Sequence, residues 1–189
     1  MEDSYEVEVK ISIDSYEEME KRILEVGAKK INREIQRDLY YNHPCRNFQN
    51  TDEALRLRSR QPIEGEEVDS SRGRVEITYK GPKVDSTTKT RIEASVDLHD
   101  STEMATILEH LGFELVATVI KTRQFFRLPS ITISIDEVED VGLFMELETM
   151  AQPKDVDDAR EQIFTIMEKL GLDPSQSIRE SYLEIYLNR

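Results

Sequence analysis

The feature that most constrains the fold is an alternation of apolar and charged residues with a period of two. In residues 4–13, SYEVEVKISI, apolar side chains take one face of an extended segment, and Glu6, Glu8 and Lys10 take the other. The same alternation recurs farther along the chain, in residues 54–60, 72–80 and 88–98. Each of these segments is predicted to be a strand with one apolar face and one charged face.

Segments whose apolar residues have helical spacing separate these strands. The segments predicted to be helices lie at residues 16–27, 101–110, 155–170 and 178–188, and the first three are followed or closed by a glycine. Further strands are expected at residues 29–42 and, two or three of them, between 113 and 149. Both halves of the chain run from a strand to a helix to a long strand, which suggests a duplicated unit within one domain spanning residues 1–189.

Two folds remain open for such strands. The first is a single sheet with one solvated face. The second is a barrel whose charged faces converge on one lumen. Arg and Glu dominate the charged faces, and the apolar faces need the helices as cover, so we favour the barrel. The predicted class is α+β: a closed eight-stranded antiparallel β-barrel, or tunnel, with helices packed outside.

A lumen lined by both signs of charge has a definite chemistry. Arg and Lys clusters suit phosphoryl oxygens, and Arg binds them as a bidentate fork. Carboxylates in the same space suit a hard divalent cation that bridges to those oxygens. The pattern therefore predicts a cavity for a metal-bound polyphosphate.

Composition excludes several other functions. The net charge of −14 argues against a general nucleic-acid partner, which needs a basic field. The single cysteine, Cys45, excludes an internal disulfide, and no nearby His and acid support it as a nucleophile. No membrane span is expected, because no run of about 18 apolar residues exists. The acidic start, MEDSYE, lacks the apolar segment of a signal peptide, so the expected compartment is the cytoplasm.

Eight short motifs in order along the chain carry a family resemblance. They are EVEVK (6–10), DLYY (38–41), DEALRLRSR (52–60), TYKGP (78–82), TRIEASV (90–96), KTR (121–123), DEVEDVGLFMELE (136–148) and RESYLEIYL (179–187). The chain resembles the CYTH family, also called triphosphate tunnel metalloenzymes, and within it the archaeal class IV adenylyl cyclase-like branch. The resemblance implies a closed eight-stranded antiparallel tunnel with helices outside.

The resemblance also implies roles for single residues. Residues expected to hold Mg²⁺ or Mn²⁺ are Glu6, Glu8, Glu146 and Glu148, with Asp136 assisting. Residues expected to grip the triphosphate are Lys10, Arg56, Arg58, Lys80, Arg91, Lys121, Arg123 and Arg179. Lys10 with Tyr40 or Tyr41 is expected to serve catalysis. Many family members have Asp-Thr-Pro where this chain has Asn42-His43-Pro44, which leaves the residue that activates the nucleophile open.

The expected partner is a small molecule that carries a triphosphate, with no nucleic acid and no membrane. The favoured reaction is that of a class IV adenylyl cyclase, in which ATP yields cyclic AMP and pyrophosphate. The alternative is hydrolysis of ATP, thiamine triphosphate or tripolyphosphate by a triphosphatase. A third hypothesis is a non-catalytic sensor of polyphosphate or nucleotide. The outer helices leave room for a homodimer.

Overall fold

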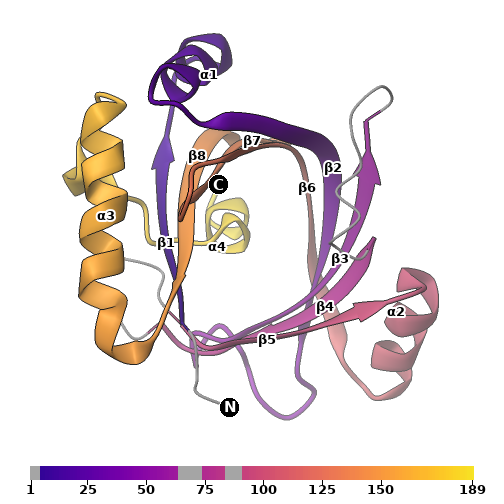
Figure 1. Cartoon of the computed structure of the whole chain (residues 1–189). Coiled ribbons are helices and arrows are strands. Elements are labelled where there is room, and N and C mark those ends of the chain that lie inside the picture. The colour runs from indigo at the N-terminus through magenta and orange to yellow at the C-terminus, as the bar shows by residue number, and fades with distance from the viewer. Residues whose placement is uncertain (1–4, 64–73, 84–90) are drawn as a thin grey trace.

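The computed structural model describes residues 5–63, 74–83 and 91–189 (Figure 1). Within these ranges the strands are β1 (Tyr5–Ser12), β2 (Lys29–Asn42), β3 (Ala54–Pro62), β4 (Val75–Lys80), β5 (Glu93–Leu98), β6 (Glu114–Arg127), β7 (Thr132–Val138) and β8 (Gly142–Ala151). The helices are α1 (Tyr16–Glu25), α2 (Ser101–His110), α3 (Val156–Lys169) and α4 (Tyr182–Leu187). The predicted alternation of strands and helices is confirmed. The predicted strand ends at residues 72–73 and 88–90 lie outside the described residues.

The eight strands form one antiparallel sheet with the order β1-β8-β7-β6-β2-β3-β4-β5. β2 and β6 pair at its centre; β3, β4 and β5 follow on the side of β2, and β7, β8 and β1 follow on the side of β6. Each half runs strand, helix, strand, strand, strand. The two halves therefore share one order of elements, as the sequence pattern suggested.

The sheet is curled but its edges are not joined by a ladder in the part of the chain that the structure describes. Glu6 of edge strand β1 and Arg91, just before edge strand β5, form a single antiparallel bridge. Extending that bridge along β1 requires the residues before Arg91, and extending it along β5 requires those before Tyr5. Both stretches lie outside the described residues. The eight-stranded antiparallel sheet is thus confirmed, and within the described residues it is a curled sheet that is open except at this bridge.

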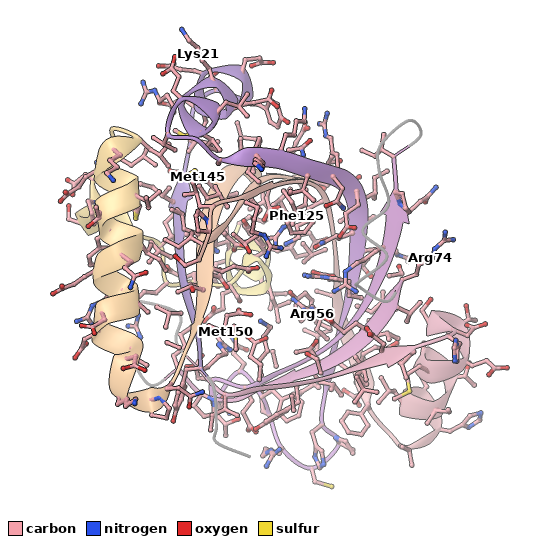
Figure 2. All side chains as sticks on the ribbon, in the orientation of Figure 1. Lys21, Arg56, Arg74, Phe125, Met145 and Met150 are labelled. Atoms are coloured by element: carbon pink, nitrogen blue, oxygen red, sulfur yellow. The ribbon has the colours of Figure 1, made fainter. Side chains whose placement is uncertain are left out.

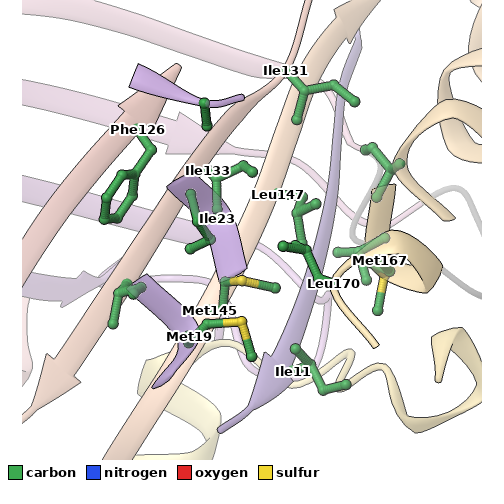
Figure 3. Packing of buried hydrophobic residues seen from close by; sticks show 14 of the residues in the cluster. Ile11, Met19, Ile23, Phe126, Ile131, Ile133, Met145, Leu147, Met167 and Leu170 are labelled. Atoms are coloured by element: carbon green, nitrogen blue, oxygen red, sulfur yellow. The ribbon is translucent and has the colours of Figure 1, made fainter. Parts of the chain in front are cut away.

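The apolar strand faces point outward. Val7, Val9 and Ile11 of β1 are buried in a cluster that includes side chains from β7, β8, α1 and α3. Figure 3 shows this packing, with Ile23 of α1 and Met167 of α3 facing the strands. Over β1, β7 and β8 the helices α1 and α3 remove this face from water, and the charged faces are left to the inside of the curl. The side chain of Arg56 extends into that interior (Figure 2).

Helix α4 departs from the prediction that all helices lie outside. It covers the inner side of the curl at one end, within the outline of the sheet (Figure 1). Its Tyr182 packs with inward-facing Tyr40, Val119 and Phe144, which form a second apolar cluster. Apolar residues on an otherwise charged face need cover, and α4 supplies it. No helix among the described residues is long and apolar enough to cross a membrane.

Candidate functional site: a charged cavity inside the curled sheet

A cavity of about 640 Å³ occupies the inside of the curl. Residues from seven strands, from the segment 42–53 and from α4 line it. The lining cations are Arg56, Arg58, Arg60, Lys80, Lys83, Arg91, Lys121 and Arg123. The lining carboxylates are Glu6, Glu8, Asp52, Glu53, Glu76, Glu93, Asp97, Glu146, Glu148 and Glu184. The predicted convergence of the charged strand faces on one interior space is therefore present.

One wall of the cavity is acidic. Glu8 of β1 lies directly opposite Glu148 of β8 in the antiparallel register, and Glu146 and Glu6 lie two residues along these strands on the same face. Carboxylate oxygens are the ligands that Mg²⁺ and Mn²⁺ take in proteins, so the donor chemistry of this wall fits a hard divalent cation. In the side-chain positions of the described residues, no three acidic, His or Cys side chains are close enough together to hold a metal ion.

Asp136, the fifth residue expected to bind metal, lies behind the lining. It is fully buried on β7 and does not line the cavity. Arg123 donates to both of its carboxylate oxygens, Lys121 Nζ lies 3.4 Å from Oδ2, and Tyr182 Oη donates to Oδ2 at 2.7 Å. Burial raises the pKa of this carboxyl, but Arg123 and Lys121 outweigh burial and lower the pKa below its ordinary value. In this arrangement Asp136 holds the cations that face the cavity.

The opposite wall is cationic, and carboxylates hold its guanidinium groups. Asp38 accepts hydrogen bonds from Arg58 Nε at 2.6 Å and from Arg58 Nη2 at 2.7 Å. Burial lowers the pKa of Arg58, but Asp38 more than offsets this and raises it. Arg56 Nη2 donates to Glu76 Oε1 at 3.2 Å. Burial raises the pKa of Glu76, yet Arg56 and Arg60 prevail and lower it to about 2. Arg58 and Glu76 are therefore charged at neutral pH.

Lys121 is a cavity cation whose charge changes in mildly alkaline solution. Its side chain is 2% exposed and lines the cavity. Burial and the nearby Arg123 lower its pKa to about 8, although Asp136 acts in the opposite direction. An ammonium group with this pKa loses its proton in mildly alkaline solution.

Lys80 and Arg91 lie at the edge where β1 approaches β5. Lys80 Nζ pairs with Glu93 and lies 4.0 Å from Glu6 Oε1. Arg91 is buried and donates to the carbonyl of Gly81 at 3.4 Å. Both line the cavity, so the cationic groups meet the acidic wall at this edge.

Lys10 and Arg179 do not line the cavity. Lys10 faces the interior, as its period predicted, but it is fully buried beside α4, where Nζ donates to the carbonyl of Glu180 and lies 4.2 Å from the centre of the Tyr182 ring. Arg179 is exposed just before α4. The residues 178–189 cover this end of the curl, which strand periodicity alone does not reveal.

The two candidate tyrosines differ in their surroundings. Tyr40 is buried and lines the cavity, and burial together with the charge of Asp38 raises its pKa to about 12. It is therefore a neutral hydrogen-bond donor at physiological pH. Tyr41 reaches the cavity rim but packs mainly with Leu57 and other apolar residues on the outer side, and a register shift separates the two tyrosines in the β2–β6 ladder.

Several lining or supporting residues received no role from the sequence. Arg60 continues the period of Arg56 and Arg58, so the pattern contained a signal for it. Asp38 lies two residues before Tyr40 on the inner face of β2, which is a weaker signal. Lys83 follows the Gly81-Pro82 turn outside any strand period. Its Nζ bonds Asp52 at 2.7 Å and Glu184 of α4 at 3.2 Å, contacts that only the folded chain brings together.

Comparisons with known proteins agree with this geometry. A family model described as the CYTH domain matches residues 4–182. A protein of Methanocaldococcus jannaschii, named as a candidate adenylate cyclase, is 36% identical over 181 residues, which cover 95% of this chain and 97% of that protein. Adenylate cyclase CyaB of Aeromonas hydrophila is 27% identical over 148 residues, covering 78% of this chain and 70% of that protein.

Solved structures show the same fold. A protein of Pyrococcus horikoshii has a TM-score of 0.85 and 37% identity, covering 97% of this chain and 98% of its own. A Hippeastrum protein, described as a candidate adenylyl cyclase with a dominant triphosphatase activity, has a TM-score of 0.63 and 14% identity, covering 98% of this chain and 95% of its own. At that identity the second likeness concerns the fold alone.

Proposed function

Because the chain belongs to the CYTH family, we propose that its cavity binds a triphosphate-bearing small molecule and processes it with Mg²⁺ or Mn²⁺, as a class IV adenylyl cyclase-like enzyme acting on ATP. The observation that carries the proposal is the pairing of an acidic wall with a cationic wall across one cavity. A metal-bound polyphosphate offers the complement of both walls. The names of the relatives from M. jannaschii and A. hydrophila support the cyclase reaction over the hydrolase.

The roles of the chain's residues follow from their placement. Glu6, Glu8, Glu146 and Glu148 are proposed to hold the divalent cation, which when bound neutralises charge on the phosphoryl oxygens. The cations proposed to bind the phosphoryl groups are Arg56, Arg58, Lys80, Arg91, Lys121 and Arg123. Catalysis by such a site consists mainly of orientation and charge stabilisation, and the buried ion pairs supply both by keeping the donors in place.

Neutral Tyr40 is proposed to donate a hydrogen bond to the substrate, since its raised pKa disfavours the phenolate that a general base requires. Lys10 and Arg179 belong to the α4 end, and a contact with substrate from either would need a rearrangement there. We therefore propose no direct phosphate contact for them in this arrangement.

The products of one incubation test the proposal. The protein is incubated with Mg²⁺ or Mn²⁺ and, separately, with ATP, thiamine triphosphate or tripolyphosphate. Cyclic AMP with pyrophosphate is the expected result. Orthophosphate would replace the cyclase by a triphosphatase, and tight binding without turnover would indicate a sensor. A protein that neither binds nor turns over any of the three compounds would overturn the proposal.

The affinity for tripolyphosphate is expected to fall as pH rises through about 8, because Lys121 then loses the proton that the bound anion favours. Above that pH the dissociation constant attributable to this group should rise by about tenfold per pH unit. Calorimetric titration from pH 6.5 to 9.5 measures the effect. Lys121→Arg is the matched variant, since a guanidinium keeps its charge over this range and the comparison removes the ligand's own titration.

Stability should change in the opposite direction over the same range. The folded pKa of Lys121 lies below its ordinary value of 10.5, so between the two values the unfolded chain binds more protons at this group. The contribution of Lys121 to the free energy of unfolding therefore rises with pH while the affinity falls. If the free energy of unfolding changes with pH in the same way in the wild type and in Lys121→Arg, the lowered pKa of Lys121 is contradicted.

A further inference from the structure

Asp38 is a buried carboxylate next to the cavity that has no direct access to a ligand. It is 1% exposed on β2, directly opposite Arg58 on β3 in the antiparallel register. Arg58 lines the cavity, whereas Asp38 does not. Any effect of Asp38 on a bound molecule must therefore pass through its neighbours.

The contact between the two side chains fixes the orientation of the guanidinium. Both carboxylate oxygens accept, one from Nε at 2.6 Å and one from Nη2 at 2.7 Å. Two parallel hydrogen bonds set the plane of the fork as well as its position. They use the edge formed by Nε and Nη2, which leaves the donors of Nη1 for another acceptor.

The electrostatic surroundings explain why a carboxylate is needed behind this arginine. Arg123 repels the charge of Arg58, and Lys121 and Arg56 also interact with Asp38. Burial raises the pKa of Asp38, but Arg58 and these cations overcome burial and lower it. A cluster of like charges would otherwise separate before an anion arrives, and Asp38 offsets that repulsion.

We propose that Asp38 is a positioning residue, which holds the Arg58 fork so that its Nη1 side meets a phosphoryl oxygen of the bound polyphosphate. This inference rests on the proposed function for its ligand. In this proposal, Asp38 affects the affinity for polyphosphate only through Arg58. That distinguishes the proposal from a general effect of Asp38 on stability or on the electrostatic potential of the cavity.

The first test needs no ligand. The Nε–H of Arg58, observed by ¹⁵N nuclear magnetic resonance, is expected to exchange slowly with water in the wild type. Asp38→Asn should speed that exchange by about tenfold or more, as loss of a charge-assisted hydrogen bond implies. Asp158→Asn, on the exposed face of α3, is the matched control and should leave the signal unchanged. An unaltered signal in Asp38→Asn would overturn the inference.

The second test measures tripolyphosphate binding in a double-mutant cycle. Asp38→Asn should weaken binding by about tenfold to a hundredfold in the wild type. In the Arg58→Met background the same substitution should change binding by less than about twofold, because the group through which it acts is gone. Equal effects in the two backgrounds would show that Asp38 acts independently and would overturn the proposal.

One further variant and the double variant of the cycle keep the test decisive if Asp38→Asn does not fold. Asp38→Glu retains the charge but moves the carboxylate by one methylene, so it should weaken binding if position matters and leave it unchanged if charge alone matters. The double variant Asp38→Asn/Arg58→Met removes both buried charges and should fold. A wild type whose Nε–H is protected but which binds no tripolyphosphate would refute the proposed function and the role of Arg58 toward a phosphoryl oxygen, while the orientation of Arg58 by Asp38 would stand.

Discussion

Asp136→Asn is expected to lower the free energy of unfolding by about 3–5 kcal/mol, the usual cost of removing one partner from a buried ion pair. Asp136 is fully buried and accepts from Arg123, Lys121 and Tyr182. An amide keeps the shape but removes the charge that balances two buried cations. Urea-induced unfolding followed by circular dichroism measures the change.

The same experiment decides between two roles for Asp136. As a metal ligand it would affect metal-dependent turnover with little change in stability, whereas as the anchor of Arg123 it affects stability first. Asp140→Asn is the matched control, because Asp140 is an exposed turn residue with a φ of 60°, a conformation that Asn tolerates. A loss of stability no larger than that of the control would contradict the anchoring role.

The sign of the pH dependence follows from the lowered pKa of Asp136. A carboxyl with a depressed folded pKa contributes stability above its unfolded value of 3.8, and the contribution is lost as pH falls through the folded value. The difference in stability between the wild type and Asp136→Asn should therefore be full at neutral pH and shrink in strong acid.

Glu8→Gln is expected to reduce metal-dependent turnover by at least about a hundredfold, which is the upper end of the cost of losing a residue that only supports a metal ligand. Glu8 lines the acidic wall opposite Glu148, so the substitution removes a hard anionic oxygen donor and relieves repulsion between the two carboxylates. The fold should persist for that reason. Initial rates across a range of Mg²⁺ and Mn²⁺ concentrations measure the loss.

Glu168→Gln, an exposed substitution on α3, controls for the change in net charge and should retain wild-type rates. Metal binding in the two variants is compared by calorimetry without nucleotide. Full activity in Glu8→Gln would remove the acidic wall from the metal assignment. Lost activity with unchanged metal affinity would move the role of Glu8 to the substrate.

Much of the fold could be predicted because strand patterning is local. Alternating residues point to opposite faces of any strand, so the motifs EVEVK and ALRLRSR predicted their charged faces without any knowledge of strand pairing. The starts of two helices also depend on local sequence, since the side chains of Ser15 and Asp100 cap the N-termini of α1 and α2. The family motifs then suggested roles for those faces.

The differences from the sequence-based expectations arise where contacts join residues far apart in the chain. Closure depends on whether β1 and β5 meet over their length, and they share a single bridge among the described residues. The position of Lys10 depends on α4, whose Glu180 carbonyl is 170 residues away along the chain. Periodicity assigned Lys10 to the correct face but contained no information about what covers it.

The division has a physical cause. The direction in which a side chain points is set by its own backbone, so residue order alone placed both signs of charge on the inner face. The partner that a charge finds is set by strand register and by helix packing, which are properties of the whole chain. Asp136 shows the difference. The sheet face on which it lies could be predicted from the strand pattern. That its carboxylate binds Arg123 and Tyr182 and does not line the cavity depends on the assembled fold.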